Sequence, residues 1–233
     1  MFHAWKADYD SGMSEEQHIA VTRTARYYIL GEPSLEVNDV WFVCHGYGQL
    51  AVDFIREFEG IADPRRLIVA PEALSRYYIS AEGKFHGPDS QVGATWMTRE
   101  DREVEIADYV RYLDDLYAEI MKSVGESRVT VLGFSQGGAT ANRWLTRGSS
   151  RADRLVMWGA LLATDSDLNQ AARFFRTVEL TLVYGTRDQF TDEGMIAKYK
   201  SVLDSHSIPY KVVTFDGGHR MDRDTLLTLA RTT

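Results

Sequence analysis

The stretch VTVLGFSQGGAT, from Val129 to Thr140, places a serine between two glycines, after a β-branched run and before a run of small residues. The β-branched run is typical of a buried strand, and the small residues that follow favour the start of a helix. Gly133, Ser135 and Gly137 fit the pattern G-x-S-x-G, in which the serine occupies a sharp strand-to-helix turn. The stretch therefore predicts a strand-turn-helix unit that presents Ser135 as a nucleophile, with an ordinary Gly-rich turn as the alternative.

Strand-like runs recur along the chain and alternate with segments of helical character. The clearest helix is expected within 99–124, where apolar residues repeat about every 3.6 positions. The strand-like runs are 24–30, 40–45, 66–70, 128–134, 154–160, 179–185 and 210–215. Such alternation predicts an α/β fold, with a mostly parallel central sheet and helices on both faces.

The chain length favours a single domain. Its 233 residues fall within the range of about 200 to 250 that one α/β domain often occupies. We therefore expect one domain over 1–233, with an N-terminal extension at 1–22 that leads into an edge strand. Residues 71–98 are punctuated by glycine and proline and rich in aromatic residues, and we expect a lid-like or pocket-forming loop there.

Composition and charge argue against a nucleic-acid partner and a membrane anchor. The formal charge of −8, from 26 basic and 34 acidic residues, would repel a phosphate backbone, so we expect no nucleic-acid partner. No apolar stretch approaches the roughly 20 residues that span a bilayer, and the first residues lack a secretory signal, so we expect no stable membrane anchor. Cys44 is the only cysteine. That is consistent with a reducing compartment and with a cytoplasmic protein.

A serine nucleophile needs a base, and two histidines follow Ser135 in the chain. In parallel sheets the reactive crevice lies beyond the carboxyl ends of the strands. His206 precedes the strand-like run 210–215, whereas His219 follows it. We therefore expect His219 to be the base and His206 to have no part in the chemistry.

The acid that orients the base is selected by the same rule. Asp188 follows the run 179–185 and should reach the same edge of the sheet as the base. Asp165 and Asp167 also follow a strand-like run and stay open as a second choice. The order serine, acid, histidine is the order of α/β-hydrolase triads.

Two backbone N–H groups should stabilise an oxyanion beside the nucleophile. Gln136 provides one by its position directly after Ser135, and Tyr47 in HGYGQL (45–50) provides the other. A structural turn without a ligand is the alternative for this second stretch. We expect His45 to satisfy the backbone of the turn and Cys44 to be a small buried side chain.

Several side chains of 71–98 are candidates for the wall of an acyl pocket above the serine: Tyr77, Tyr78, Phe85, Trp96 and Met97. Ligand sites are mostly apolar and aromatic with few polar groups. The same side chains would equally suit a satellite core beneath the loop, so both interpretations stay open.

The segments HGYG, GFSQGG, GTRD and GGH, in this order and spacing, resemble the phospholipase/carboxylesterase family of α/β-hydrolases, which includes the acyl-protein thioesterases. The resemblance covers roughly residues 25–230. It implies an α/β-hydrolase fold, no cofactor, a triad of Ser135, Asp188 and His219, and a position near the acyl site for Trp96. Gln49 departs from the acidic residue usual in the first segment. The stretch 71–98 also differs, so a preference for long lipid chains is not carried over.

These features predict a serine hydrolase of the carboxylesterase or lysophospholipase type that acts on a small-molecule ester, with thioesters as a second substrate class. A peptidase or amidase on the same triad, and a catalytically silent binding module, are the alternatives. The histidines show no H-x-x-x-H spacing, so we expect no metal. The sequence does not identify the physiological ester, the acyl length or the oligomeric state.

Overall fold

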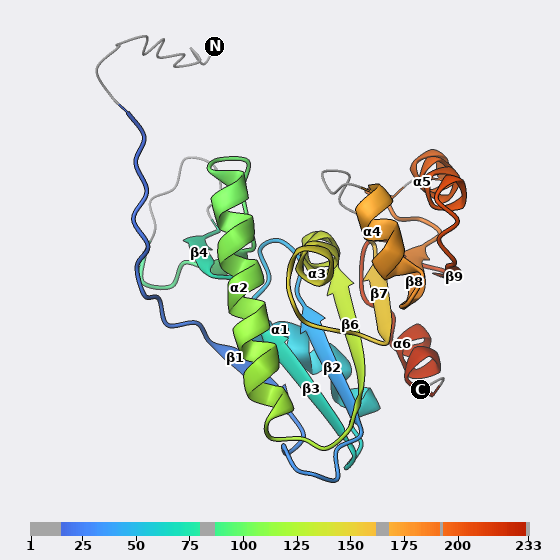
Figure 1. Cartoon of the computed structure of the whole chain (residues 1–233), viewed down its shortest axis with the longest axis horizontal. Helices are drawn as coiled ribbons and strands as arrows, with labels where there is room; N and C mark the ends of the chain where they lie inside the picture. Colours follow the sequence, from blue (N-terminus) through green and yellow to red (C-terminus); the bar gives the residue numbers. More distant parts are fainter. Residues whose placement is uncertain (1–14, 80–86, 162–167, 192, 232–233) are drawn as a thin grey trace.

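The computed structural model describes residues 15–79, 87–161, 168–191 and 193–231, and Figure 1 shows a central sheet flanked by helices. Within these residues one sheet has seven strands in the order β1-β3-β2-β6-β7-β8-β9. The strands are β1 (Tyr27–Leu30), β2 (Asp39–Cys44), β3 (Arg66–Pro71), β6 (Arg128–Phe134), β7 (Arg154–Trp158), β8 (Glu179–Gly185) and β9 (Lys211–Phe215). All neighbouring strands run parallel except β1, which pairs antiparallel with β3 at the edge. The predicted α/β class and the edge strand are confirmed.

The central strands are largely apolar after their first residue because both faces of the sheet are covered there. Every residue of β2 and β7 is buried, as expected for central parallel strands. Alternate side chains enter two cores: Phe42 belongs to one cluster, whereas Trp41 and Val43 belong to the other.

Helices on each face complete the two cores. The first core includes residues of α2 (Arg102–Met121), α3 (Gln136–Arg147), α4 (Leu168–Phe175) and α5 (Glu193–Ser205). The second includes residues of α1 (Ala51–Phe54), the 3-10 helix η1 (Ile55–Ile61) and α6 (Arg223–Arg231). The helix predicted within 99–124 is α2, which begins after Asp101, a residue in the left-handed region. Among the described residues, no helix has the length and apolar character needed to cross a membrane.

The stretch 71–98 differs from the expected loop. It contains a separate two-stranded antiparallel hairpin, β4 (Ser75–Tyr78) and β5 (Val92–Thr95), in which Ser75 pairs with Thr95 and Tyr78 with Val92. Residues 80–86 lie outside the described part of the chain. Periodicity alone did not reveal these strands because each has only four residues and β5 is made largely of small ones.

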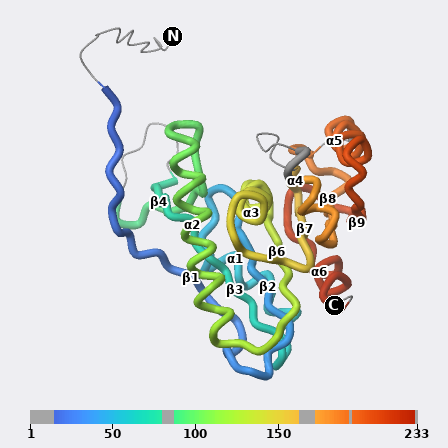
Figure 2. The backbone as a smooth tube through the Cα atoms, viewed as in Figure 1, coloured from blue at the N-terminus to red at the C-terminus, as the bar shows by residue number. Residues whose placement is uncertain are grey.

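The described part of the N-terminal extension begins at residue 15, and residues 1–14 lie outside the structure's description. Figure 2 shows the segment before β1, in blue, on the side of the sheet that carries α2. The hydroxyl of Tyr112 in α2 donates a hydrogen bond to the carbonyl of Arg26 at 3.1 Å, which fixes the entry into β1.

Candidate active site

Ser135 lies between β6 and α3, at the sharp turn that its sequence pattern predicts. Its φ of 53° and ψ of −120° are rare for a residue other than glycine. The turn is held on both sides: the N–H of Ser135 donates to the carbonyl of Trp158 at 2.8 Å, and the N–H of Gly138 donates to the carbonyl of Ser135 at 2.9 Å. This strained, over-determined geometry is typical of a nucleophile elbow.

The glycines on either side of Ser135 are required by close backbone contacts. A Cβ atom on Gly133 would overlap the carbonyl of Gly137, and one on Gly137 would overlap the carbonyl of Cys44. The start of α3 therefore packs directly on the end of β2, where the HGYGQL segment begins. This contact brings the two segments predicted to donate to an oxyanion beside each other.

Asp188 and His219 meet at the carboxyl edge of β8 and β9. Nδ1 of His219 lies 2.8 Å from Oδ2 of Asp188, and the second carboxylate oxygen accepts the N–H of Phe190 at 2.8 Å. The Asp188 side chain is 1% exposed and that of His219 is 15% exposed. Burial by itself would raise the pKa of Asp188, but hydrogen bonds from His219, Phe190 and Thr191 outweigh it and hold the pKa below its usual value.

The imidazole of His219 lies beside the serine turn. Its ring centroid is 4.9 Å from that of Phe134, the residue before Ser135, and 4.8 Å from that of Phe190. A Cβ atom on Gly159, the residue after Trp158, would lie 2.9 Å from Cε1 of His219. The structure thus brings Asp188 and His219 into direct contact and places the backbone that holds Ser135 against the imidazole.

The disfavoured base, His206, lies away from this site, and the second-choice acids lie outside the described residues. Nδ1 of His206 is 2.9 Å from the carbonyl of Val202, at the end of α5 and before β9, which is the opposite strand edge from His219. Asp165 and Asp167 lie outside the described residues.

The HGYGQL segment forms a tight turn at the end of β2. Gln49 Oε1 accepts the N–H of Gly46 at 2.8 Å, and the N–H of Gln49 donates to the carbonyl of Gly46 at 3.2 Å. A neutral side-chain oxygen therefore closes this turn. Gly48 has a φ of +77°, which explains the second glycine of the segment. The Tyr47 side chain is 61% exposed at the tip of the turn.

His45 satisfies backbone groups, as expected. Its Nδ1–H donates to the carbonyl of Gly46 at 2.8 Å, and its Nε2 accepts the N–H of Ala73 at 3.1 Å. Both contacts require a neutral ring with the proton on Nδ1, and burial lowers the pKa of His45. The neighbouring Cys44 is fully buried, which raises the pKa of its thiol to about 12.

The candidate pocket residues occupy different environments. Trp96 is 2% exposed, its indole N–H donates to the carbonyl of His45 at 2.9 Å, and its ring packs edge-on against Tyr109, so it belongs to the core. Met97 is partly buried against the same core. The ring of Tyr77 lies 5.4 Å from that of Tyr47. Tyr78 is half exposed, and Phe85 lies outside the described residues.

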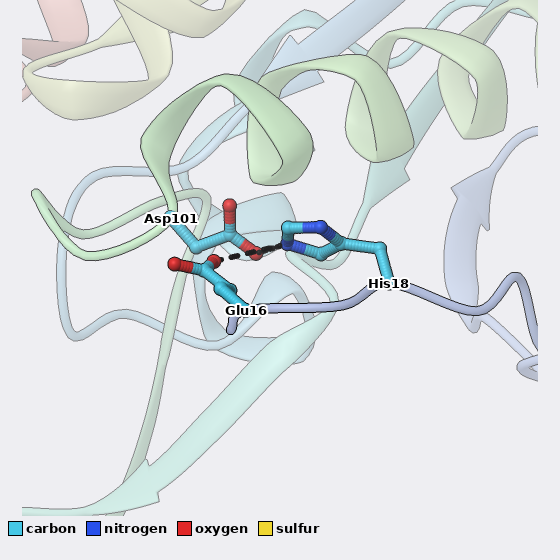
Figure 3. Close-up of side chains that lie close together, drawn as sticks. All are labelled: Glu16, His18 and Asp101. Carbon is cyan, nitrogen blue, oxygen red and sulfur yellow. Dashed lines mark hydrogen bonds and ion pairs between the residues drawn. The ribbon is translucent and has the colours of Figure 1, made fainter. Parts of the chain in front are cut away.

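One group of side chains in the described residues has a spacing that a cation would accept, as Figure 3 shows. Nε2 of His18 is 3.2 Å from Glu16 Oε1 and 3.0 Å from Asp101 Oδ2. All three residues are exposed, and both carboxylates share one imidazole nitrogen, so ordinary surface ion pairs account for the arrangement. The group spans the N-terminal segment and the residue before α2, and the sequence does not reveal it because Asp101 is 83 positions from His18.

Residues 28–232 match the family model described as Phospholipase/Carboxylesterase, and the chain belongs to that family of α/β-hydrolases. Among solved structures, the acyl-protein thioesterase 2 of Zea mays is 16% identical with a TM-score of 0.67, covering 90% of this chain and 97% of that one. The Bacillus cereus carboxylesterase is 13% identical with a TM-score of 0.63, covering 89% of this chain and 92% of that one. At such low identity these likenesses establish the α/β-hydrolase fold. No curated protein matches the sequence.

Proposed function

We propose that the protein hydrolyses carboxylic esters of small molecules through an acyl-enzyme on Ser135, with thioesters as a second substrate class. The observation that carries this proposal is the Asp188–His219 pair, joined at 2.8 Å beside a serine in a strained turn. A neutral imidazole with its Nδ1 proton held by a carboxylate presents Nε2 as a base, which is the arrangement that activates a serine hydroxyl.

The first half of the reaction forms the acyl-enzyme. Oγ of Ser135 attacks the ester carbonyl while Nε2 of His219 takes the hydroxyl proton. The backbone N–H groups of Tyr47 and Gln136 stabilise the oxyanion, supported by the positive end of the α3 dipole. The imidazolium then gives its proton to the leaving alcohol as the tetrahedral intermediate collapses. Asp188 fixes the tautomer and stabilises the cation, and its lowered pKa keeps it ionised for this role.

The second half reverses these roles with water as the nucleophile. His219 removes a proton from water, the hydroxide attacks the acyl-serine, and the carboxylic acid leaves as Ser135 regains its proton. Of the candidate pocket residues, Met97 and Tyr77 suit an acyl wall better than Trp96, because Trp96 is buried in the core. We assign the reaction to the carboxylesterase or lysophospholipase type, in the reducing cytoplasm, where the single buried cysteine is consistent with the compartment.

The test is steady-state hydrolysis of p-nitrophenyl esters by paired variants. We expect Ser135→Ala and His219→Ala to lower kcat by on the order of 10⁶, as triad removal does elsewhere. His206→Ala is the matched control, because its imidazole lies at the opposite strand edge, and its kcat should stay within about twofold of the parent value. A Ser135→Ala variant that keeps more than about a tenth of the activity would overturn the proposal.

A substrate comparison separates the esterase from its rivals. Matched ester and anilide substrates with the same acyl group distinguish an esterase from an amidase, because an anilide needs protonation of a much poorer leaving group. Faster turnover of the anilide would reassign the reaction, and no turnover of either would favour a binding module.

A further inference from the structure

The side chain of Gln136 is fully engaged with the strand end of the β4–β5 hairpin. Its Nε2 donates to the carbonyl of Met97 at 2.8 Å and lies 3.1 Å from the hydroxyl of Thr95. Its Oε1 accepts the N–H of Trp96 at 3.1 Å and lies 3.2 Å from the same hydroxyl. A carboxamide thus joins the first residue of α3 to three consecutive residues that are about 40 positions earlier in the chain.

The same hairpin also holds the HGYGQL turn. The N–H of Gly48 donates to the carbonyl of Ala94 at 2.9 Å, and the N–H of Ala94 donates to the carbonyl of Gln49 at 3.3 Å. A Cβ atom on Gly93 would lie 2.6 Å from the carbonyl oxygen of Gly48, so the two segments are in close backbone contact. The indole N–H of Trp96 donates to the carbonyl of His45, the first residue of this segment.

These contacts connect the two proposed oxyanion donors through one hairpin and the residues that follow it. Residues 94–97 form hydrogen bonds with His45 and Gly48, which lie on either side of Tyr47. They also form hydrogen bonds with the side chain of Gln136, whose backbone N–H is the second proposed donor. We propose that Gln136 is a positioning residue, whose carboxamide sets the separation and the direction of the Tyr47 and Gln136 N–H groups. This inference rests on the proposed ester hydrolysis, and it assigns to the side chain a task separate from that of its backbone.

The residue type follows from the contacts. The site needs a donor toward the carbonyl of Met97 and an acceptor for the N–H of Trp96, and at neutral pH only an amide of this length supplies both. An ionised glutamate keeps the acceptor but sets an anion against the carbonyl of Met97. Methionine has a similar length and supplies neither strong hydrogen bond. Gln136→Met and Gln136→Glu both keep the backbone N–H, so these substitutions change only its placement.

The experiment compares a p-nitrophenyl ester with its thionoester, in which sulfur replaces the carbonyl oxygen. Sulfur is a weak hydrogen-bond acceptor, so the thionoester gains little from the two N–H donors. We expect Gln136→Met to lower kcat/KM for the ester by about 10- to 100-fold, the scale of a misplaced donor. The rate for the thionoester should fall much less, so the ester-to-thionoester ratio should fall by about the same factor as the ester rate.

Gln136→Glu provides a second variant with its own readout. At neutral pH we expect a reduced ester-to-thionoester ratio, and as pH falls the protonated carboxyl regains a donor for the carbonyl of Met97, so the ratio should recover. Because both substrates need His219 equally, the ratio cancels the loss of the base at low pH. Gln91→Met is the control, since Gln91 is an exposed glutamine beside the same hairpin, and its ratio should equal that of the parent.

The outcomes are distinguishable from failure of the proposed function. If Ser135→Ala keeps its esterase activity, the proposed function fails. If Ser135→Ala is inactive but both Gln136 variants keep the parent ratio, the chemistry stands and the positioning role is overturned. An equal fall for ester and thionoester in both variants would likewise overturn it, because that pattern indicates general damage to the fold.

Discussion

Asp188 and His219 are joined by a hydrogen bond of 2.8 Å between Oδ2 and Nδ1, although they come from loops after different strands. Strands β8 and β9 are paired in register, with Gly185 opposite Phe215, so the loops that follow them begin side by side. The sheet therefore assembles the pair, and in the proposed reaction the activation of Ser135 depends on it.

Replacing Asp188 by asparagine should lower kcat for esters by on the order of 10⁴, because the amide no longer holds the proton on Nδ1. Asp216→Asn is the matched control. Asp216 is an exposed acid in the same loop as His219, and it forms an ion pair with Arg187. The measurement is kcat of both variants with one p-nitrophenyl ester. A similar loss in both would show that charge near the loop, and not orientation of the imidazole, is what matters.

Phe190 is an unexpected contributor to the site. Its N–H binds Asp188 and its ring packs against His219 at 4.8 Å, although the side chain is largely exposed. An aromatic contact with a cation is worth about 0.5 to 1 kcal/mol where the ring is exposed, so Phe190→Ala should lower kcat by roughly two- to fivefold. Tyr27→Ala, at the distant edge strand, should leave kcat unchanged. No change in Phe190→Ala would mean that the ring is not needed during turnover.

Gly137→Ala should destabilise the fold, because the new methyl group overlaps the carbonyl of Cys44 and a backbone segment must move. We expect a loss of about 3 kcal/mol in the free energy of unfolding, near the upper end for overpacking. Gly87→Ala is the control, since a Cβ atom there would meet no atom within 4 Å. Urea denaturation measures both, and equal midpoints for the two variants would contradict the close contact.

His45 should make the protein less stable in mild acid. Burial lowers its pKa in the folded state, so below about pH 6.5 the unfolded chain binds the extra proton first. Stability should therefore fall as pH drops from 7 toward 5, with a contribution of at most about 1.4 kcal/mol per pH unit. His45→Asn retains a donor for the carbonyl of Gly46 and should flatten this slope, which urea titrations at several pH values would reveal. An unchanged slope would assign the acid sensitivity to other groups.

Much of the architecture was predictable because it depends on local patterns. Short sequence segments predict the buried strand before Ser135 and the glycines around it. The choice of His219 follows from simple topology, because it comes after a strand of the parallel sheet. The position of His45 in its turn followed from the same logic. The Asp188–His219 contact agrees with the expectation that loops after parallel strands meet at one edge of the sheet. The proposed variants test the catalytic roles of the two residues.

The features that were missed depend on tertiary contact. The β4–β5 hairpin consists of four-residue strands whose pairing, not their periodicity, defines them. The sequence suited Trp96 to a pocket and to a core equally, and its burial, its packing against Tyr109 and its bond to the carbonyl of His45 assign it to the core. For Gln136 the sequence pointed to the backbone N–H alone, because the partners of the side chain are about 40 residues away. The one sequence signal for Phe190 is that an aromatic residue stands two positions after Asp188.

The most direct test of the account is covalent labelling with a fluorophosphonate, followed by peptide mass mapping. We expect one adduct per chain, on the peptide that contains Ser135, with no adduct in Ser135→Ala and strongly slowed labelling in His219→Ala. An intact parent protein that stays unlabelled, or an adduct on any other residue, would contradict the claim that Ser135 is the activated nucleophile.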